Sequence, residues 1–347
     1  VTVSGAMDLR NHKIANALVS NNGNVASIEF AYQGPLLKLK NGKINFAITG
    51  DIAFNIIRKN SVIEEGKCYK SYILESEEQL DILSTKKSVY GYLAISGGIK
   101  LEKFWNSYSV NTKANIGPNN GNKFSLNENI FLKNLDNNLL TQKKINYKNL
   151  PNNSIRVIKG TNFNYFSEVA QKNFFKEEYL ITNLTDRMGM RLRGSALENI
   201  NSTNIKSEGL IRGVIQVPAD GNPIILLNDH GTIGGYPKIG VIISADLDRV
   251  TQLIPGTNIK FEEVNSNIIN VLENIIKKKM EGKCIDNGYI KKDSIKLVSY
   301  SSGELISNNV LFEIVYECLI CNPVESTQIE CVVKNITKAG IRAELPE

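Results

Sequence analysis

The side chains best suited to holding a small molecule lie in one polar, glycine-rich stretch, residues 208–240. Within it, Gln216 carries a neutral amide that can orient a substrate carbonyl, and Asp220 carries a carboxylate that can accept N–H donors from an amide. The Gly234-Gly235-Tyr236 sequence could let the backbone and an aromatic ring approach a flat ligand closely. On its chemistry alone, this stretch is a candidate binding rim.

Each of these residues also has a purely structural interpretation. Asp-Gly is a usual composition of a tight turn, so Asp220 could shape the turn at residues 218–223 and nothing more. Side chains alternate between the two faces of a strand, so Gln216 could point to solvent. A glycine pair before a tyrosine is most often a tight turn with a stacking ring. The sequence leaves both interpretations open.

A second group of candidate residues lies outside this stretch. Asp186 and Arg187 are adjacent and could form a surface salt bridge, which contributes little to stability. Alternatively, the guanidinium of Arg187 could bind a substrate carboxylate in bidentate fashion, the geometry that its planar fork favours. Ser4 and Gly5 could belong to the same rim, whereas Asp8 is placed to cap the helix that follows it.

Several other kinds of site lack the residues that they need. The chain has two histidines, His12 and His230, and no G-x-S-x-G sequence, so we predict no Ser-His-Asp triad. It has no P-loop sequence for ATP and no Met-Lys-Met sequence for the attachment of biotin. If the chain works with ATP or biotin, we therefore expect other subunits to bind them.

The cysteines are few and odd in number: Cys68, Cys284, Cys318, Cys321 and Cys331. Such a set in a long chain favours reduced thiols. Because the sequence also shows no membrane-length apolar run and no signal peptide, we expect a cytoplasmic protein. Cys318 and Cys321 suggest zinc, but residues three apart on a strand face opposite ways, so we predict no metal site.

The composition is that of an ordinary globular protein with two or more domains, since 42% of the 347 residues are hydrophobic and 22% are charged. The net charge is +6. Residues 1–263 hold 31 Lys+Arg against 24 Asp+Glu, whereas the rest of the chain holds 10 against 11. So mild an excess favours anionic small molecules and argues against nucleic acid as a partner.

The hydrophobic pattern predicts many short strands and a few helices. Strands are expected at residues 26–32, 35–39, 44–49, 66–75, 90–95, 154–160, 188–193, 210–217, 224–227 and 239–243, and helices at 13–19, 76–83, 244–253 and 268–276. The Asn41-Gly42 pair predicts a hairpin between the strands that flank it. An Asn-rich stretch, residues 116–153, is expected to connect two β-rich halves.

Seven collinear segments of the first 264 residues resemble the biotin-dependent carboxyltransferase family, which includes the C-type component of 5-oxoprolinase, allophanate-hydrolase-subunit-2-like proteins and part of urea carboxylase. The segments are VSGAMD, GPLLKL, GYLAISGGI, TDRMGMRLRG, SEGLIRGVIQVPADGNPIILL, GGYPKIGVIISADL and LIPGTNIKFEEV. The family usually has a further segment ahead of SGAMD. Its Ser-Thr-Asp and glycine-rich stretch is only loosely matched here by residues 107–121. Either departure could weaken a pocket shared between the two halves.

The resemblance implies a mostly β fold of cyclophilin-like β-barrel units with short helices, in the halves 1–115 and 154–264. It implies a component of an ATP-dependent 5-oxoprolinase, which opens 5-oxoproline to glutamate, or of a related enzyme that moves a carboxyl group from carboxybiotin to a urea-type substrate. The expected catalytic residues are then Asp220, Arg187 and Gln216, and the expected substrate-binding residues are Tyr236, Gly234, Gly235, Ser4 and Gly5. Partner subunits, among them a smaller cyclophilin-like one, would use the ATP and carry any biotin.

The tail, residues 265–347, resembles the seventh-subunit stalk protein of RNA polymerase, especially versions from large DNA viruses. Segments such as KLVSYSSGEL and FEIVYECLICNPVESTQIECVVKNITKAGIRAEL carry the resemblance. It implies a small α+β domain that ends in an incomplete OB-like segment, residues 327–345, since an OB barrel needs five strands. Two alternative functions follow: a non-catalytic regulatory protein that antagonises a kinase inhibitor, and tail-mediated association with RNA polymerase or RNA.

Overall fold

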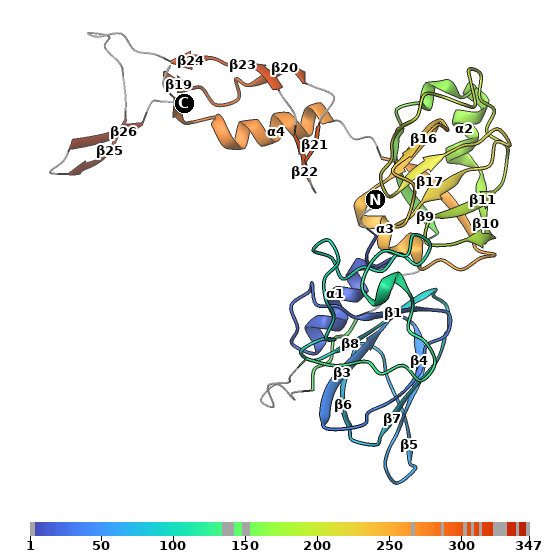
Figure 1. The fold of residues 1–347 in the computed structure, drawn as a ribbon. Helices are drawn as coiled ribbons and strands as arrows, with labels where there is room; N and C mark the ends of the chain where they lie inside the picture. The colour runs from blue at the N-terminus through green and yellow to red at the C-terminus, as the bar shows by residue number, and fades with distance from the viewer. Residues whose placement is uncertain are drawn as a thin grey trace. The chain divides into compact units, whose positions relative to one another are not determined.

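The structure is a computed structural model that describes residues 4–133, 142–147, 153–264, 268–285, 288–300, 304–306, 309–311, 314–321, 332–337 and 340–344. The chain divides into two compact units, Val1–Val264 and Asn265–Glu347. The prediction of a mostly β fold with short helices is confirmed (Figure 1).

The first half of the larger unit contains two antiparallel four-stranded sheets, with the strand orders β1-β8-β3-β6 and β2-β7-β4-β5. The strands are β1 (Ile28–Ala31), β2 (Leu36–Lys38), β3 (Lys43–Thr49), β4 (Ile52–Ile57), β5 (Ile63–Glu65), β6 (Ser71–Glu75), β7 (Gln79–Thr85) and β8 (Tyr90–Ile95). Alternate side chains of both sheets, such as Phe46, Phe54 and Tyr72, fill a common core because successive residues of a strand point to opposite faces.

The second half closes into a barrel with the strand order β10-β11-β14-β13-β16-β9-β17. Its strands are β9 (Ser154–Lys159), β10 (Glu178–Thr185), β11 (Gly189–Arg193), β13 (Val214–Gln216), β14 (Ile224–Leu226), β16 (Lys238–Ile242) and β17 (Asn258–Glu263). Two short strands, β12 (Glu208–Gly209) and β15 (Ile233–Gly234), form a separate ladder. The helices α2 (Glu168–Lys176) and α3 (Ser244–Thr251) pack against the barrel. The predicted barrel is thus present in this half.

One hydrophobic core joins the two halves. It holds the interior of the barrel together with Met7, Leu18 of α1 (Leu9–Leu18) and Tyr92 of β8. The N-terminal segment and α1 therefore lie where the halves meet, as Figure 1 shows. The chain begins and ends this unit at the same place in space.

Hydrogen bonds at the start of α1 hold it there. Asp8 is the N-cap and accepts a hydrogen bond from the Asn11 N–H at 2.9 Å, so its predicted capping role is confirmed. Asp248 of α3 accepts hydrogen bonds from the N–H groups of Leu9 (3.2 Å) and Arg10 (3.1 Å). A helix of the second half thus satisfies backbone donors of a helix of the first half.

The helix predicted at residues 76–83 is wrong, because this segment is a turn followed by β7. Leu80 and Ile82 are buried and alternate with less buried residues, which is the period of a strand. Glu77 has a left-handed φ of +70°, and the carboxylate of Glu78 binds Arg58 at 2.9 Å. The acidic residues that suggested a helix start therefore form a tight turn.

The hairpin predicted at Asn41-Gly42 is also wrong. Gly42 does have a left-handed φ of +88°, but β2 before it pairs with β7, and β3 after it pairs with β6 and β8. The turn carries the chain from one sheet to the other. Strand β4, whose alternating burial begins at Ile52, was not predicted.

The strand predicted at residues 210–217 is shorter in the structure. Only Val214–Gln216 join the barrel, because Gly213 adopts a left-handed φ of +89° and interrupts the extended chain before them. The turn predicted after this strand is present, since the carbonyl of Pro218 accepts a hydrogen bond from the Gly221 N–H at 3.0 Å. Strand β14 follows it as predicted.

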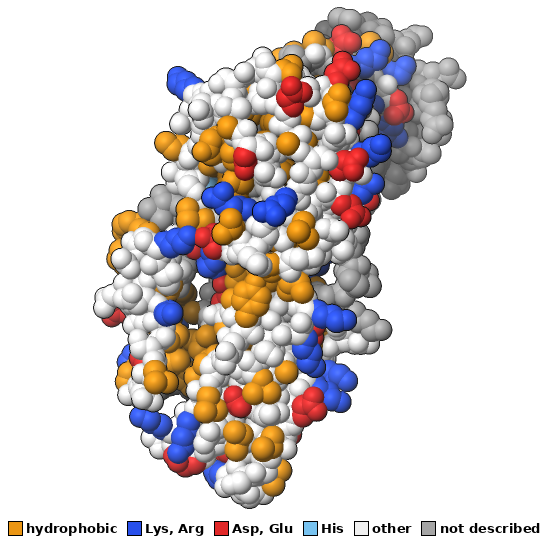
Figure 2. Space-filling model, turned by 90° about the vertical axis from the view of Figure 1, so that its right-hand side faces the viewer, with side chains coloured by type: hydrophobic (Ala, Val, Ile, Leu, Met, Phe, Trp, Pro, Cys, Tyr) orange, Lys and Arg blue, Asp and Glu red, His pale blue; other side chains and the backbone are white. Residues whose placement is uncertain are grey.

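In its described parts, 116–133 and 142–147, the Asn-rich connection has no regular strand beyond isolated bridges. Its Ile130 and Leu132 pack against the core of the first half. The connection therefore covers this half instead of hanging free. On the described part of the face drawn in Figure 2, basic and acidic side chains are interspersed, without a basic stripe.

The smaller unit begins with α4 (Ile268–Met280), as predicted, and packs a small core around Ile276, Ile290 and Ile295. Its strands are β18 (Cys284–Ile285), β19 (Gly288–Ile290), β20 (Lys296–Tyr300), β21 (Glu304–Ile306), β22 (Asn309–Leu311), β23 (Ile314–Glu317), β24 (Ile320–Cys321), β25 (Val332–Thr337) and β26 (Gly340–Glu344). The described residues of the predicted OB-like segment form one antiparallel hairpin, β25–β26. None of the helices described in either unit has both the length and the apolar character required to cross a membrane.

The Asp246 carboxylate should control stability in acid. It is almost fully buried in the first turn of α3 and accepts hydrogen bonds from the Arg156 backbone N–H at 2.9 Å and guanidinium at 2.7 and 3.1 Å. Burial acts to raise its pKa, but Arg156 and Arg249 outweigh burial and lower the pKa to about 2. A carboxylate with a depressed pKa stabilises the fold above its unfolded pKa of about 4 and loses that effect as the pH falls through its folded pKa.

We therefore expect Asp246→Asn to lower the free energy of unfolding by about 1–2 kcal/mol at neutral pH, with a difference from wild type that shrinks between about pH 4 and pH 2. Urea denaturation at a series of pH values measures this. Glu178→Gln, at an exposed position of β10, is the control. A difference that does not change with pH would contradict the assignment.

Candidate functional site

Arg187 and Asp229 meet at one end of the barrel. Arg187 precedes β11 and Asp229 follows β14, which are paired strands. Backbone hydrogen bonds continue this pairing beyond the strands, from Leu227 to Met188 at 3.0 Å and from Asp229 to Arg187 at 2.8 Å. The guanidinium then binds the carboxylate in bidentate fashion, Nε to Oδ2 at 2.8 Å and Nη2 to Oδ1 at 3.1 Å.

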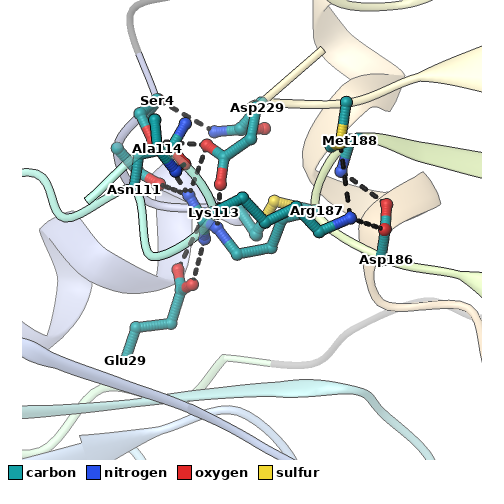
Figure 3. Close-up of polar contacts among 12 residues, drawn as sticks. Ser4, Glu29, Asn111, Lys113, Ala114, Asp186, Arg187, Met188 and Asp229 are labelled. Atoms are coloured by element: carbon teal, nitrogen blue, oxygen red, sulfur yellow. Dashed lines mark hydrogen bonds and ion pairs between the residues drawn. The ribbon is translucent and has the colours of Figure 1, made fainter. Parts of the chain in front are cut away.

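The N-terminal segment completes one side of this ion pair, as Figure 3 shows. Nη2 of Arg187 donates to the carbonyl of Gly5 at 2.7 Å, and the hydroxyl of Ser4 donates to Asp229. Gly5 has a φ of +87°, which favours glycine and aims its carbonyl at the guanidinium. The structure therefore brings the predicted residues Ser4, Gly5 and Arg187 together.

Glu29 of β1 closes the other side and was missed by the sequence analysis. It pairs with Nη1 of Arg187 and accepts hydrogen bonds from the Met7 N–H and the Tyr92 hydroxyl, each at 2.8 Å. Its neighbours Ile28 and Phe30 face the core of the first half, so alternation turns Glu29 towards the barrel. That isolated acid in an apolar strand was the only signal for it. We call Arg187, Glu29, Asp229, Ser4 and Gly5 the Arg187 cluster.

A pocket of about 350 Å³ opens beside the cluster. Its lining residues are Glu29, Phe30, Ala31, Tyr32, Val89, Tyr90, Thr185, Asp186, Arg187, Leu227 and Thr251. Burial raises the pKa of Glu29, and the attraction of Arg187 only partly offsets this. Burial acts to lower the pKa of Arg187, but Glu29 and Asp229 hold it above its ordinary value. The pocket thus keeps a permanent cation beside a carboxyl group that takes up a proton more readily than an exposed glutamate does.

Asp186 lies at the rim of the pocket and does not pair with Arg187, so the predicted Asp186–Arg187 salt bridge is wrong. Its carboxylate binds Nζ of Lys113 at 2.5 Å and accepts hydrogen bonds from the N–H groups of Met188 (2.7 Å) and Gly189 (3.1 Å). Burial raises its pKa, but Lys113 and these N–H groups outweigh burial and lower it. Adjacent residues thus serve different partners.

Gln216, Gly234, Gly235 and Tyr236 form a second group. The Gln216 side chain is buried and donates a hydrogen bond to the carbonyl of Tyr236 at 3.2 Å, so it does not face solvent. A Cβ atom on Gly234 would lie 2.9 Å from its amide nitrogen, and one on Gly235 would lie 3.0 Å from the carbonyl of Ile205. The two glycines therefore permit close packing of the chain, and the ring of Tyr236 is partly exposed.

Asp220 is exposed in the turn between β13 and β14. Its Oδ1 accepts a hydrogen bond from the Asn222 N–H at 3.1 Å, which is the turn-forming role that the sequence left open. The turn lies at the end of the β13–β14 hairpin opposite to Leu226, and hence away from Asp229. Within the described residues, no hydrogen bond or ion pair joins Asp220 to the Arg187 cluster. Its predicted catalytic role stays a prediction.

The histidines and cysteines do not gather. Nδ1 of His230 lies 2.6 Å from the carbonyl of Gly231, and Nδ1 of His12 lies 2.7 Å from Oγ of Ser27. Burial raises the pKa of the Cys68 thiol to about 11, which makes it a poor nucleophile. The part of the chain that the structure describes holds no cluster of three potential metal ligands, and Cys331 lies outside it.

Removing the guanidinium should destabilise the larger unit. Arg187→Met would leave two carboxylates, Glu29 and Asp229, half-buried and without their cation. We expect a loss of about 2–4 kcal/mol in the free energy of unfolding, since breaking such a pair strands a charge. Denaturant unfolding measures it, with Arg191→Met at an exposed position of β11 as the control. Equal stability of the two variants would refute the central role of Arg187.

Comparison with known proteins places this site in a family. The model of the carboxyltransferase domain, subdomains A and B, matches residues 1–263. The chain is 31% identical to the C-type component of 5-oxoprolinase from Haemophilus influenzae over 262 residues, which cover 75% of this chain and 82% of that protein. It is 28% identical to the corresponding 5-oxoprolinase component of Escherichia coli over 259 residues, which cover 74% of this chain and 81% of that protein.

A shorter match involves a protein described as a DNA-directed RNA polymerase subunit of Acanthamoeba polyphaga mimivirus. It is 30% identical over 98 residues, which cover 27% of this chain and 49% of that protein. This gives weak support to the polymerase resemblance of the tail.

Solved structures share the fold. TTHA0988 is 27% identical with a TM-score of 0.66, over 76% of this chain and 50% of that one, so the match spans half of its length. Urea carboxylase of Kluyveromyces lactis is 20% identical with a TM-score of 0.69, over 88% of this chain and 29% of that one, which shows the fold alone. With the family model matched over the whole of the larger unit, this chain belongs to the carboxyltransferase domain family, subdomains A and B.

Proposed function

We propose that this chain is the component of an ATP-dependent 5-oxoprolinase, or of a related biotin-dependent carboxyltransferase, that holds a planar amide substrate. The observation that carries the proposal is the family match over residues 1–263, which contain both the Arg187 cluster and its pocket. Two relatives that the chain covers by more than four fifths are C-type components of 5-oxoprolinase. The pocket, at about 350 Å³, has the size expected of a small-molecule site.

Ring opening of 5-oxoproline adds one water across the lactam C–N bond and yields glutamate, while a second water cleaves ATP to ADP and phosphate. Negative charge develops on the amide oxygen or nitrogen during this reaction. A fixed cation in a partly desolvated pocket stabilises such charge, and Arg187 provides one. Glu29, which lines the same pocket, can take a proton from water or from the amide. We therefore assign Arg187 to electrostatic stabilisation and Glu29 to proton transfer.

The proposed partners follow from what this sequence lacks. Without a P-loop or a biotin-attachment sequence, ATP would be used and biotin carried by other subunits, among them a smaller cyclophilin-like one. The pocket fits the ureido ring of biotin chemically, because Glu29 and Asp186 can accept its N–H groups beside apolar walls. Carboxylated biotin would supply the carboxyl group. The cytoplasmic location, the kinase-inhibitor antagonist and the polymerase or RNA association stay predictions.

Glu29→Gln tests the proposal. Reconstituted with its partner subunits, the wild type should consume 5-oxoproline in the presence of ATP, and the variant should lose at least about 100-fold in kcat, because a general base contributes that much. The acid limb of the wild-type kcat/KM profile should lie above the ordinary pKa of glutamate, since burial raises the pKa of Glu29. Activity is measured as glutamate formed, with Arg191→Met as the control. Full activity of Glu29→Gln would exclude its role.

Asp220→Ala separates the two groups of candidate residues. If the substrate sits in the pocket of the Arg187 cluster, we expect this exposed turn residue to be removable with less than about a threefold loss of kcat/KM, which is the scale of a surface substitution. If the loss reaches about 100-fold, the scale of a lost catalytic group, the substrate binds at the β13–β14 turn, beside Gln216 and Tyr236. The same glutamate assay decides between them.

A further inference from the structure

We propose that Lys113 binds the carboxylate of the substrate at the rim of the Arg187 pocket and thereby makes a carboxylate-bearing cyclic amide, not neutral urea, the preferred substrate. This inference rests on the proposed function and specifies its substrate class. Lys113 belongs to the loop at residues 107–121, the stretch that only loosely matches the family sequence.

The charge of the pocket calls for another cation. Its lining includes two acidic residues, Glu29 and Asp186, and one basic residue, Arg187. The guanidinium of Arg187 already donates to Asp229, Glu29 and Gly5, so its donors are largely taken. An anionic substrate would meet excess negative charge in such a pocket. Lys113, whose Nζ lies 2.5 Å from Oδ2 of Asp186, places a compensating positive charge at the rim.

Asp186 can release Lys113 at little cost. The other carboxylate oxygen of Asp186 is held by the N–H groups of Met188 at 2.7 Å and Gly189 at 3.1 Å, so its position does not depend on the lysine. The side chains of Lys113 and Asp186 are 61% and 49% exposed, and exposed ion pairs of this kind are weak. A substrate carboxylate can therefore take the place of Asp186 as the partner of Nζ.

The backbone presents Lys113 from a fixed loop. Asn111 and Ile116 exchange two backbone hydrogen bonds, at 2.8 and 3.1 Å, and the Asn111 side chain accepts a third from the Ala114 N–H at 3.1 Å. Lys113 lies between these residues, and its side chain reaches across to Asp186 and Met188 (Figure 3). Only the flexible side chain has to move, because the loop is already closed.

The test compares two variants that should act in opposite directions. The full chain is reconstituted with its partner subunits, and KM and kcat are measured for 5-oxoproline and for its neutral analogue 2-pyrrolidinone. We expect Lys113→Met to raise the KM for 5-oxoproline about tenfold with kcat nearly unchanged, and Lys113→Arg to restore most of the affinity. Asp186→Asn, which frees Lys113, should lower that KM. The kinetics with 2-pyrrolidinone should not change, and Lys123→Met, at an exposed lysine of the following segment, should behave as wild type.

The outcomes distinguish this inference from the proposed function. If the wild type consumes 5-oxoproline and Lys113→Met has the same KM, Lys113 does not bind the carboxylate and the proposed function stands. If both Lys113→Met and Asp186→Asn raise the KM for 5-oxoproline and 2-pyrrolidinone alike, the pair is structural and the inference fails. If the wild-type complex consumes no amide, the proposed function fails and this inference with it.

Discussion

The guanidinium of Arg187 is the interaction on which the larger unit depends. It belongs to the barrel, yet it donates hydrogen bonds to Asp229 of the barrel, to Glu29 of the first half and to the carbonyl of Gly5. A planar group with five donors is the one side chain that can serve three acceptors in different directions at once. The partly buried carboxylates need it in turn, because neither could stay ionised there without a cation. The candidate site is thus also the joint between the halves.

Sequence patterns predicted the β-rich fold and much of the barrel, since β8, β14 and β16 are apolar runs bounded by turn residues. They failed where one local signal has two structural outcomes. Gly42 favours a tight turn, but only the tertiary fold decides whether that turn joins neighbouring strands or two sheets. Glu77 and Glu78 resemble a helix start, yet the neighbouring Leu80 and Ile82 alternate as in a strand. The limits of these predictions therefore lie in long-range pairing.

The candidate site was predicted in part for the same reason. Ser4, Gly5 and Arg187 were recognisable from their segments, but nothing local to the sequence links Glu29 to Arg187, which lies far along the chain. Gln216 and Asp220 were natural candidates by residue type. Their environment explains them differently, since the first holds the carbonyl of Tyr236 and the second shapes its own turn. Residue type indicates what a side chain can do, whereas its partners decide what it does.

The shared core at the N-terminal segment has a consequence for synthesis on the ribosome. Asp8 accepts a hydrogen bond from Gln252, and Met7 accepts one from Thr251 through its carbonyl, so the first residues of the unit wait for nearly the last. The first half can collapse early around its own core of Phe46 and Phe54, but the segment that completes the pocket has no partner until α3 emerges. Contacts this distant along the chain form late and slowly. A chain interrupted before α3 would hold a folded first half and an unprotected N-terminal segment, which makes the pocket a marker of completed translation of this unit.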